Sequence, residues 1–128
     1  MVMVEKKYLT LNDVECYKMS FRLSNLIWDI VIRWKPFQQG TLGKQFVNAV
    51  DSISANIAEG FGRYGKKDKI RFYRIANGSV LESLDWNEKA KVRKFLSAEE
   101  YKYNLEQLKQ IPKMINMLVK ITNSKLTI

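Results

Sequence analysis

The chain has 128 residues, 46% of them apolar, and carries a formal net charge of +9 at neutral pH. This is enough for one domain with its own core, and the composition excludes an intrinsically disordered chain. The sequence has no histidine and a single cysteine, Cys16, which excludes catalytic triads, histidine zinc sites, thiolate metal clusters and an intrachain disulfide. The charge makes nucleic acid or an anionic membrane surface the first partners to consider, although solubility alone explains it equally well.

The first predicted helix spans residues 12–34. Asn12 and Glu15 have the spacing of a capping box, and Pro36 follows the predicted end. The apolar residues form two overlapping stripes, which are Tyr17, Phe21, Trp28 and Val31, and Leu23, Ile27, Ile30 and Trp34. Because so wide an apolar face exceeds what one neighbouring helix needs, we expect this helix to be covered on two sides.

The second predicted helix spans residues 42–59. Its apolar residues recur in steps of four, three and four, at Phe46, Val50, Ile53 and Ile57. This is the spacing of an inward-facing seam in a helical bundle. We expect Gly60 and Gly62 to end the helix, since glycine accepts the left-handed conformation that closes many helices.

The third predicted helix, residues 67–94, carries small residues between two aromatic ones. This seam consists of Phe72, Ala76, Ser79, Ser83, Trp86 and Ala90, with Tyr73, Val80 and Leu84 on a second stripe. Close approach of another helix along the small residues would offset the helix-weakening effect of Gly78.

The fourth predicted helix begins after Ser97, which forms a capping box with Glu100. We expect Pro112 to kink it, and residues 1–10 and 123–128 to be flexible tails. Its inner face is predicted to hold Tyr101, Leu105, Leu108, Ile115 and Val119. Short links make consecutive helices antiparallel, so the sequence predicts a single all-α domain, an up-down-up-down four-helix bundle.

Basic residues concentrate between the second and third helices. Six cations face one acid, Asp68, and they are Arg63, Lys66, Lys67, Lys69, Arg71 and Arg74. Because Tyr64 and Phe72 lie among them, phosphate contacts with occasional base stacking are one interpretation, and a solvated helix face is the other. Cations at a helix N-terminus oppose the helix dipole, which favours the functional interpretation. A second basic cluster, near the end of the third helix, consists of Lys89, Lys91, Arg93 and Lys94.

No pattern indicates catalysis, and we expect no enzyme activity, metal or cofactor. Glu82, Asp85 and Glu88 share one side of the third helix, but surface ion pairs with nearby lysines explain them better than a cation site. The glycines after the second helix lack the Lys-Ser/Thr of a phosphate loop. No signal peptide or membrane-length apolar run is present, so a cytoplasmic protein without membrane contact is predicted.

Residues 54–63, Ser-Ala-Asn-Ile-Ala-Glu-Gly-Phe-Gly-Arg, resemble a known family signature. It belongs to the bacterial four-helix-bundle proteins encoded in intervening sequences of 23S ribosomal RNA genes. Further likeness lies in Tyr-Arg-Ile-Ala-x-Gly-Ser at 73–79 with Glu82, and in Leu96-Ser97 with Glu99-Glu100-Tyr101, so that it covers most of residues 11–121. The resemblance implies a bundle that assembles as a homopentamer and has no known catalytic activity.

A related branch of this family comprises the accessory proteins of diversity-generating retroelements, which are basic pentamers that bind nucleic acid and a reverse transcriptase. The motif residues are interpreted as structural, with Asn56 and Glu59 hydrogen-bonding across the helix end. They are Ser54, Asn56, Ala58, Glu59, Gly60 and Gly62. Two hypotheses follow: a non-catalytic homo-oligomer that binds RNA or DNA, or a structural or protein-interaction module, such as a reverse-transcriptase accessory protein, whose charge is incidental.

Overall fold

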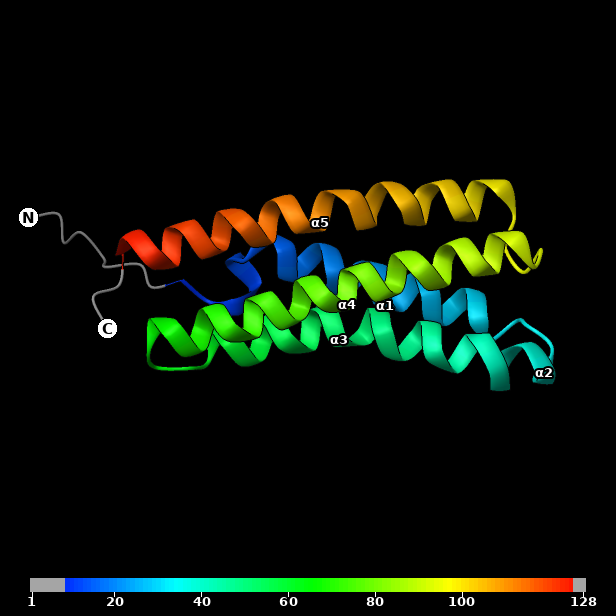
Figure 1. The fold of residues 1–128 in the computed structure, drawn as a ribbon, viewed down its shortest axis with the longest axis horizontal. Helices are drawn as coiled ribbons and strands as arrows, with labels where there is room; N and C mark the ends of the chain where they lie inside the picture. Colours follow the sequence, from blue (N-terminus) through cyan, green and yellow to red (C-terminus); the bar gives the residue numbers. More distant parts are fainter. Residues whose placement is uncertain (1–8, 126–128) are drawn as a thin grey trace, which may run out of the picture.

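Four long helices form an antiparallel bundle in the computed structural model, which describes residues 9–125 (Figure 1). They are α1 (Glu15–Val31), α3 (Lys44–Phe61), α4 (Lys66–Val92) and α5 (Ala98–Lys125). The short elements are η1 (Leu11–Asp13), α2 (Pro36–Gln38) and η2 (Gln39–Gly43), and the described residues contain no strand. Consecutive long helices pack side by side and α5 closes the bundle against α1, which confirms the predicted all-α architecture.

The seam predicted on the second helix is confirmed. Phe46, Val50, Ile53 and Ile57 on α3 are all fully buried. On α1 the stripe of Leu23, Ile27 and Ile30 is buried, and Val31 of the other stripe is buried as well. Phe21 is 50% exposed and Trp28 is 54% exposed. Part of the wide apolar face of α1 therefore lies on the surface of the monomer.

The inner face of α4 lies one residue further along than predicted. Ala76, Ser83 and Ala90 are buried as expected, but the larger positions are Tyr73, Val80 and Asn87, in place of Phe72, Ser79 and Trp86. The polar Asn87 is buried because α5 supplies its partners. Its Oδ1 accepts a hydrogen bond from Asn104 Nδ2 (3.1 Å), and its Nδ2 donates to the carbonyl of Tyr101 (3.3 Å).

The first helix begins later and ends earlier than predicted. Thr10 and Asp13 form a capping box around η1, in which the Thr10 N–H donates to Asp13 Oδ2 (2.8 Å). Helix α1 then begins at Glu15, so the predicted capping box of Asn12 and Glu15 is wrong. Pro36 does not simply follow a helix end, because it begins α2, and the chain then remains helical through η2 into α3. The link between α1 and α2 is thus only residues 32–35.

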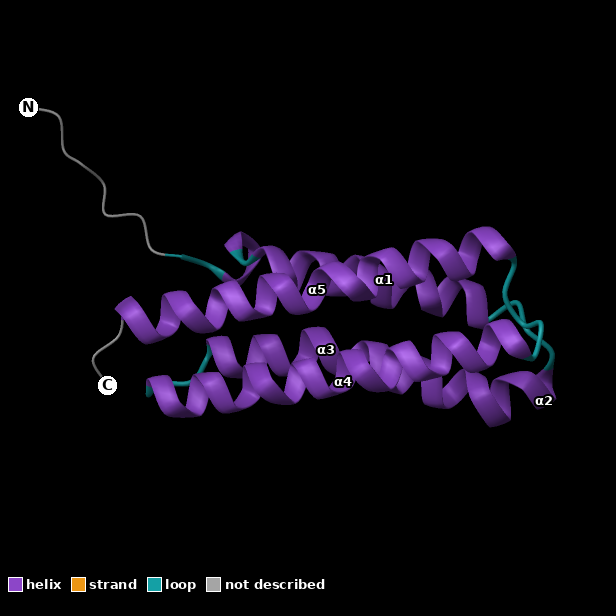
Figure 2. Cartoon of the chain, turned by 45° about the horizontal axis from the view of Figure 1, so that its top comes forward, coloured by secondary structure: helices purple, strands orange, loops and turns teal. Residues whose placement is uncertain are grey.

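The last helix confirms its predicted start. The Ser97 N–H donates to Glu100 Oε1 (2.8 Å) and the Glu100 N–H donates to Ser97 Oγ (3.0 Å). Helix α5 continues through Pro112 to Lys125 without a break (Figure 2), so residues 123–125 are helical and not a tail. The remainder of the predicted tails, 1–8 and 126–128, lies outside the described residues.

Gly62 caps α3 as predicted, but the expected left-handed conformation and the expected role of Gly60 are wrong. Gly62 has a φ of −79°, and no glycine among residues 9–125 has a positive φ. Gly60 instead lies inside α3, where a Cβ atom would meet the Tyr73 ring at 2.7 Å and the Lys69 carbonyl at 2.9 Å. It is therefore required by the close approach of α3 and α4. Gly78 has no neighbouring atom within 4 Å of such a Cβ, so no helix approaches closely there.

Cys16 is a core residue, as its small apolar side chain indicated. It is buried on α1, and burial raises the pKa of its thiol to about 11. Burial likewise raises the pKa of the Tyr73 hydroxyl to about 12. Over residues 9–125, no helix combines the length and the apolarity that crossing a membrane requires.

Candidate functional site

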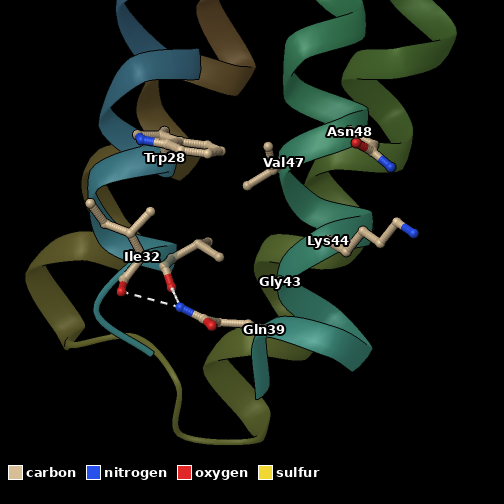
Figure 3. A pocket seen from close by; sticks show the side chains of 8 residues that line it. Trp28, Ile32, Gln39, Gly43, Lys44, Val47 and Asn48 are labelled. Carbon is tan, nitrogen blue, oxygen red and sulfur yellow. Dashed lines mark hydrogen bonds between the residues drawn. The ribbon is translucent and has the colours of Figure 1, made fainter. Parts of the chain in front are cut away.

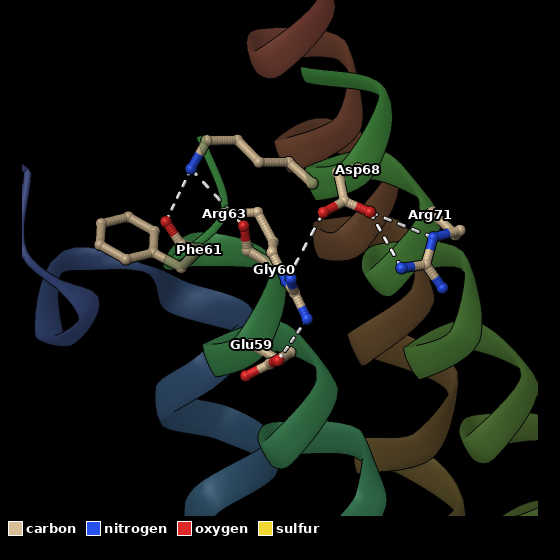
Figure 4. Close-up of polar contacts among 7 residues, drawn as sticks. Glu59, Gly60, Phe61, Arg63, Asp68 and Arg71 are labelled. Atoms are coloured by element: carbon tan, nitrogen blue, oxygen red, sulfur yellow. Dashed lines mark hydrogen bonds and ion pairs between the residues drawn. The ribbon is translucent and has the colours of Figure 1, made fainter. Parts of the chain in front are cut away.

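The α3–α4 turn gathers the predicted basic cluster at one end of the bundle. Helix α3 ends at Phe61 and α4 begins at Lys66, so Arg63 lies in the turn and the other five cations follow on α4. Figure 4 shows that several of these side chains contact α3 or one another. The six residues therefore divide by the partners that they have within the chain.

A chain of ion pairs joins the two helices through Asp68. Arg63 Nη2 lies 2.7 Å from Glu59 Oε1, and Arg63 Nε lies 3.6 Å from Asp68 Oδ2. Asp68 Oδ1 accepts hydrogen bonds from Arg71 Nη2 (2.9 Å) and Nε (3.2 Å). Both guanidinium groups also lie over the Phe72 ring, at 4.7 Å for Arg63 and 4.4 Å for Arg71. These two arginines consequently hold the turn together.

Lys69 closes the end of α3. Its Nζ donates to the carbonyl of Phe61 (2.6 Å) and approaches that of Gly60 (3.5 Å), and burial lowers its pKa. These carbonyls belong to the C-terminus of α3, the negative end of that helix dipole. The cations at the start of α4 oppose the dipole of that helix, but they also lie at the C-terminus of α3, where the dipole favours positive charge. The expectation that their position is unfavourable is therefore corrected.

Two of the six cations point outward without such contacts to residues 9–125. Lys67 and Arg74 are exposed, and the described residues give them no ion pair or hydrogen bond. Tyr64, in the same turn, is 82% exposed. Two cations and one aromatic ring are thus directly available to a polyanion at this end of the bundle.

The family-motif residues have local roles. Asn56 Nδ2 donates to the Ser52 carbonyl (2.8 Å), so it bonds back along α3 and does not cross the helix end as predicted. Glu59 does cross it, through Arg63. Ser54 Oγ donates to the Asp51 carbonyl (3.4 Å), and the Ala58 carbonyl accepts from the N–H of Gly62 (3.2 Å).

The second basic cluster is largely engaged with its own surface. Lys89 pairs with Asp85 and lies 4.6 Å from the Trp86 ring centre. Lys91 lies 4.3 Å over the Tyr101 ring, and the Tyr101 hydroxyl donates to Glu88. The two remaining cations, Arg93 and Lys94, are exposed, and Lys94 ends α4 with a φ of 62°. In the part of the chain that the structure describes, no three or more Cys, Asp or Glu residues lie together as metal ligands would.

An apolar groove of about 350 Å³ lies between α1 and the start of α3 (Figure 3). Trp28, Ile32 and Val47 line it, with Lys44 among its polar lining residues. Gln39 Nε2 donates to the carbonyls of Val31 (3.0 Å) and Ile32 (3.1 Å), which ties η2 to the end of α1. Val47 was not singled out from the sequence because it lies beside the α3 seam and not on it.

The comparisons with known proteins agree with this fold. A sequence model of the family described as 23S rRNA-intervening sequence protein matches residues 12–117. A similar solved structure is that of a protein of unknown function from the S23 ribosomal protein family of Bacteroides thetaiotaomicron VPI-5482. The two share 21% sequence identity with a TM-score of 0.73, over 82% of this chain and 98% of that chain. At this identity the likeness shows the fold alone, and no curated protein matches the chain.

Proposed function

We propose that this chain, which belongs to the family of 23S rRNA-intervening sequence proteins, is a non-catalytic protein that binds the phosphate backbone of RNA or DNA through the α3–α4 turn. The observation that carries the proposal is the pair of exposed cations Lys67 and Arg74 on the first turns of α4, which have no ion pair or hydrogen bond with residues 9–125. A net charge of +9 adds a long-range attraction for polyanions.

The geometry supports contact with phosphates more than recognition of bases. Lysine acts as a point charge for phosphate oxygens, and arginine can bind two of them at once. Tyr64 offers a ring on which an unpaired base can stack, whatever its identity. Arg63 and Arg71, fixed by Asp68, keep the turn in one conformation. Binding of this kind is largely independent of sequence and weakens as salt increases.

Reversing two charges tests this function. We expect Lys67→Glu with Arg74→Glu to weaken RNA and DNA binding, and to reduce the slope of log K against log salt by about 2, roughly one for each lost phosphate contact. The fold should persist because both side chains are exposed. Fluorescence anisotropy over a salt series measures both quantities.

A matched control carries the same charge change at the other end of the bundle. Lys35→Glu with Arg93→Glu places the change in the link between α1 and α2 and directly after α4, at the end of the bundle opposite the turn (Figure 1), where we expect a smaller effect. The proposal is wrong if the wild-type protein binds neither RNA nor DNA at low salt. It is equally wrong if the turn variant binds as tightly as the wild type.

The exposed apolar residues of α1 favour a second proposal, that the chain assembles with copies of itself. Trp28 and Ile32 line the α1–α3 groove, and each of them is about half exposed. Phe37, on α2 after the end of α1, is exposed as well. Contiguous apolar surface on a monomer commonly marks a contact with another protein, and most such contacts in oligomers join identical chains. The family resemblance puts the number of copies at five. A different protein in this groove is the alternative.

The mass in solution checks the assembly. Light scattering should give about five times the chain mass of 15.0 kDa. Trp28→Glu should lower this mass, because a charge would enter the interface, whereas Leu81→Glu, on the exposed outer face of α4, should not. A wild-type monomer at micromolar concentration would rule the assembly out.

A further inference from the structure

Four lysines form a straight row along α5. Lys102, Lys109, Lys113 and Lys120 are separated by seven, four and seven residues, and all four are exposed. With 3.6 residues per turn, these steps return to within about 20° of the same side of the helix. The row, called here the α5 lysine stripe, extends over about 27 Å at 1.5 Å per residue.

The stripe points away from the bundle. The buried residues of α5 lie on the opposite side, and they are Asn104, Leu108, Ile111, Ile115 and Thr122. Three exposed apolar residues of α5, Tyr103, Met117 and Ile121, flank the stripe, and two of them lie near other elements. Tyr103 lines a groove with Leu26 of α1, and Ile121 lines another with Phe61 of α3. Because the outermost side chains are lysines and not apolar residues, the surface suits a soluble polyanion better than insertion into a bilayer.

One acid lies beside the stripe on α5, Glu106, four residues after Lys102 and three before Lys109. None of its lysines forms an ion pair or hydrogen bond in the described residues. The sequence has no Asp or Glu after Glu106. Some other surface cations do form such pairs, as Lys18–Glu15 and Lys89–Asp85 show. A helix face that serves solubility alone ordinarily mixes both signs of charge. The dipole of α5 does not account for Lys109 and Lys113 either, since its effect is confined to the last turn.

The stripe approaches the α3–α4 turn at one end. Asn77 Nδ2 of α4 donates to Asn116 Oδ1 of α5 (3.4 Å), which sets these two residues at the same level. Since the helices are antiparallel, one turn from this contact lie Arg74 on α4 and Lys120 on α5, both toward the same end of the bundle (Figures 1 and 2). The stripe therefore reaches the level of Arg74 at Lys120 and runs along the bundle from there.

We infer that the α5 lysine stripe is a second contact surface for the phosphate backbone of a nucleic acid, and that it continues the surface formed by Lys67 and Arg74. A strand or duplex that contacts the turn would then lie along α5. This inference rests on the proposed function. It raises the number of phosphate contacts per chain from about two to about six and so predicts a steeper salt dependence than the turn alone would give.

Neutral substitutions in the stripe test the inference. We expect Lys109→Gln with Lys113→Gln and Lys120→Gln to reduce the slope of log K against log salt by about 2–3 for both RNA and duplex DNA. A control with the same net charge, Lys18→Gln with Lys35→Gln and Arg93→Gln, should leave the slope close to that of the wild type. The probes are a single-stranded RNA and a DNA duplex of equal length, and anisotropy gives the affinities.

Lysine footprinting supplies a second readout. Acetylation of the wild-type protein, analysed by mass spectrometry, should modify Lys109, Lys113 and Lys120 more slowly when RNA is bound. Lys35, at the other end of the bundle from the α3–α4 turn, should react at the same rate with and without RNA.

The outcomes separate the two proposals. If the wild type binds and the turn variant is weakened, but the stripe variant binds normally and its lysines are not protected, the inference is overturned and the proposed function stands. If the wild type binds neither nucleic acid at low salt, both fall. Binding to anionic vesicles or to an acidic protein, without binding to RNA or DNA, would also overturn the inference and assign the stripe to that partner.

Discussion

Replacing Ile53 by aspartate is expected to unfold the protein. Ile53 is fully buried at the centre of the α3 seam, between Val50 and Ile57. An unpaired carboxylate there would cost several kcal/mol, a large part of the roughly 5–15 kcal/mol that stabilises a typical domain. Circular dichroism should show lost helicity or a much lower melting temperature.

The control for this change is Ala55→Asp, which places the same side chain two residues away on the exposed side of α3. Its effect should stay within about 0.5 kcal/mol, as for most surface substitutions. If Ile53→Asp melted like the wild type, the assignment of the α3 seam to the core would be wrong.

Gly60→Ala is expected to lower the free energy of unfolding by about 1–3 kcal/mol, the usual cost of overpacking. The added Cβ would lie 2.7 Å from the Tyr73 ring and 2.9 Å from the Lys69 carbonyl. The buried ring and the backbone of α4 would both have to move. This cost opposes the advantage that alanine has over glycine within a helix, about 1 kcal/mol. Equilibrium unfolding in urea measures the difference.

Two other glycines serve as controls for this prediction. At Gly62 an added Cβ would meet no atom closer than 3.7 Å, so Gly62→Ala should be close to neutral. At Gly78, inside α4, it would meet nothing within 4 Å, so alanine should stabilise the protein by about 1 kcal/mol. Equal stability of Gly60→Ala and the wild type would contradict a close contact between α3 and α4.

The α3–α4 turn combines structural and outward cations, and this decides how its function can be tested. Arg63 and Lys69 join the end of α3 to the start of α4, and Arg71 pairs with Asp68 within α4, so changing these residues would disturb contacts of the turn together with any binding. Lys67 and Arg74 have no such partners in the described residues. Variants of these two residues therefore report on binding with little effect on stability.

The local signals in the sequence were sufficient for the architecture. The steps of four, three and four along α3 and the Ser97–Glu100 capping box both involve residues within a few turns of one another. Helical periodicity and capping depend on such near neighbours, which is why the bundle and the α3 core could be predicted.

Contacts between helices decided what the local signals could not. Asn87 is buried because Asn104 of α5 meets it, and Gly60 is glycine because Tyr73 of α4 lies against it, whereas the sequence suggested a left-handed turn at Gly60. Likewise, the cations of the turn could be identified from the sequence, but only the folded chain shows that Lys69 donates a hydrogen bond to the Phe61 carbonyl at the end of α3.

The α5 lysine stripe shows the same division between sequence and tertiary structure. Its spacing can be read from the sequence, because steps of seven, four and seven residues keep the lysines on one side of any α-helix. The direction of that side depends on which residues of α5 are buried, and its nearness to Arg74 depends on the contact between Asn77 and Asn116. Periodicity places side chains around a helix axis, but only the packing of other helices determines which of them face solvent and which distant residues they meet.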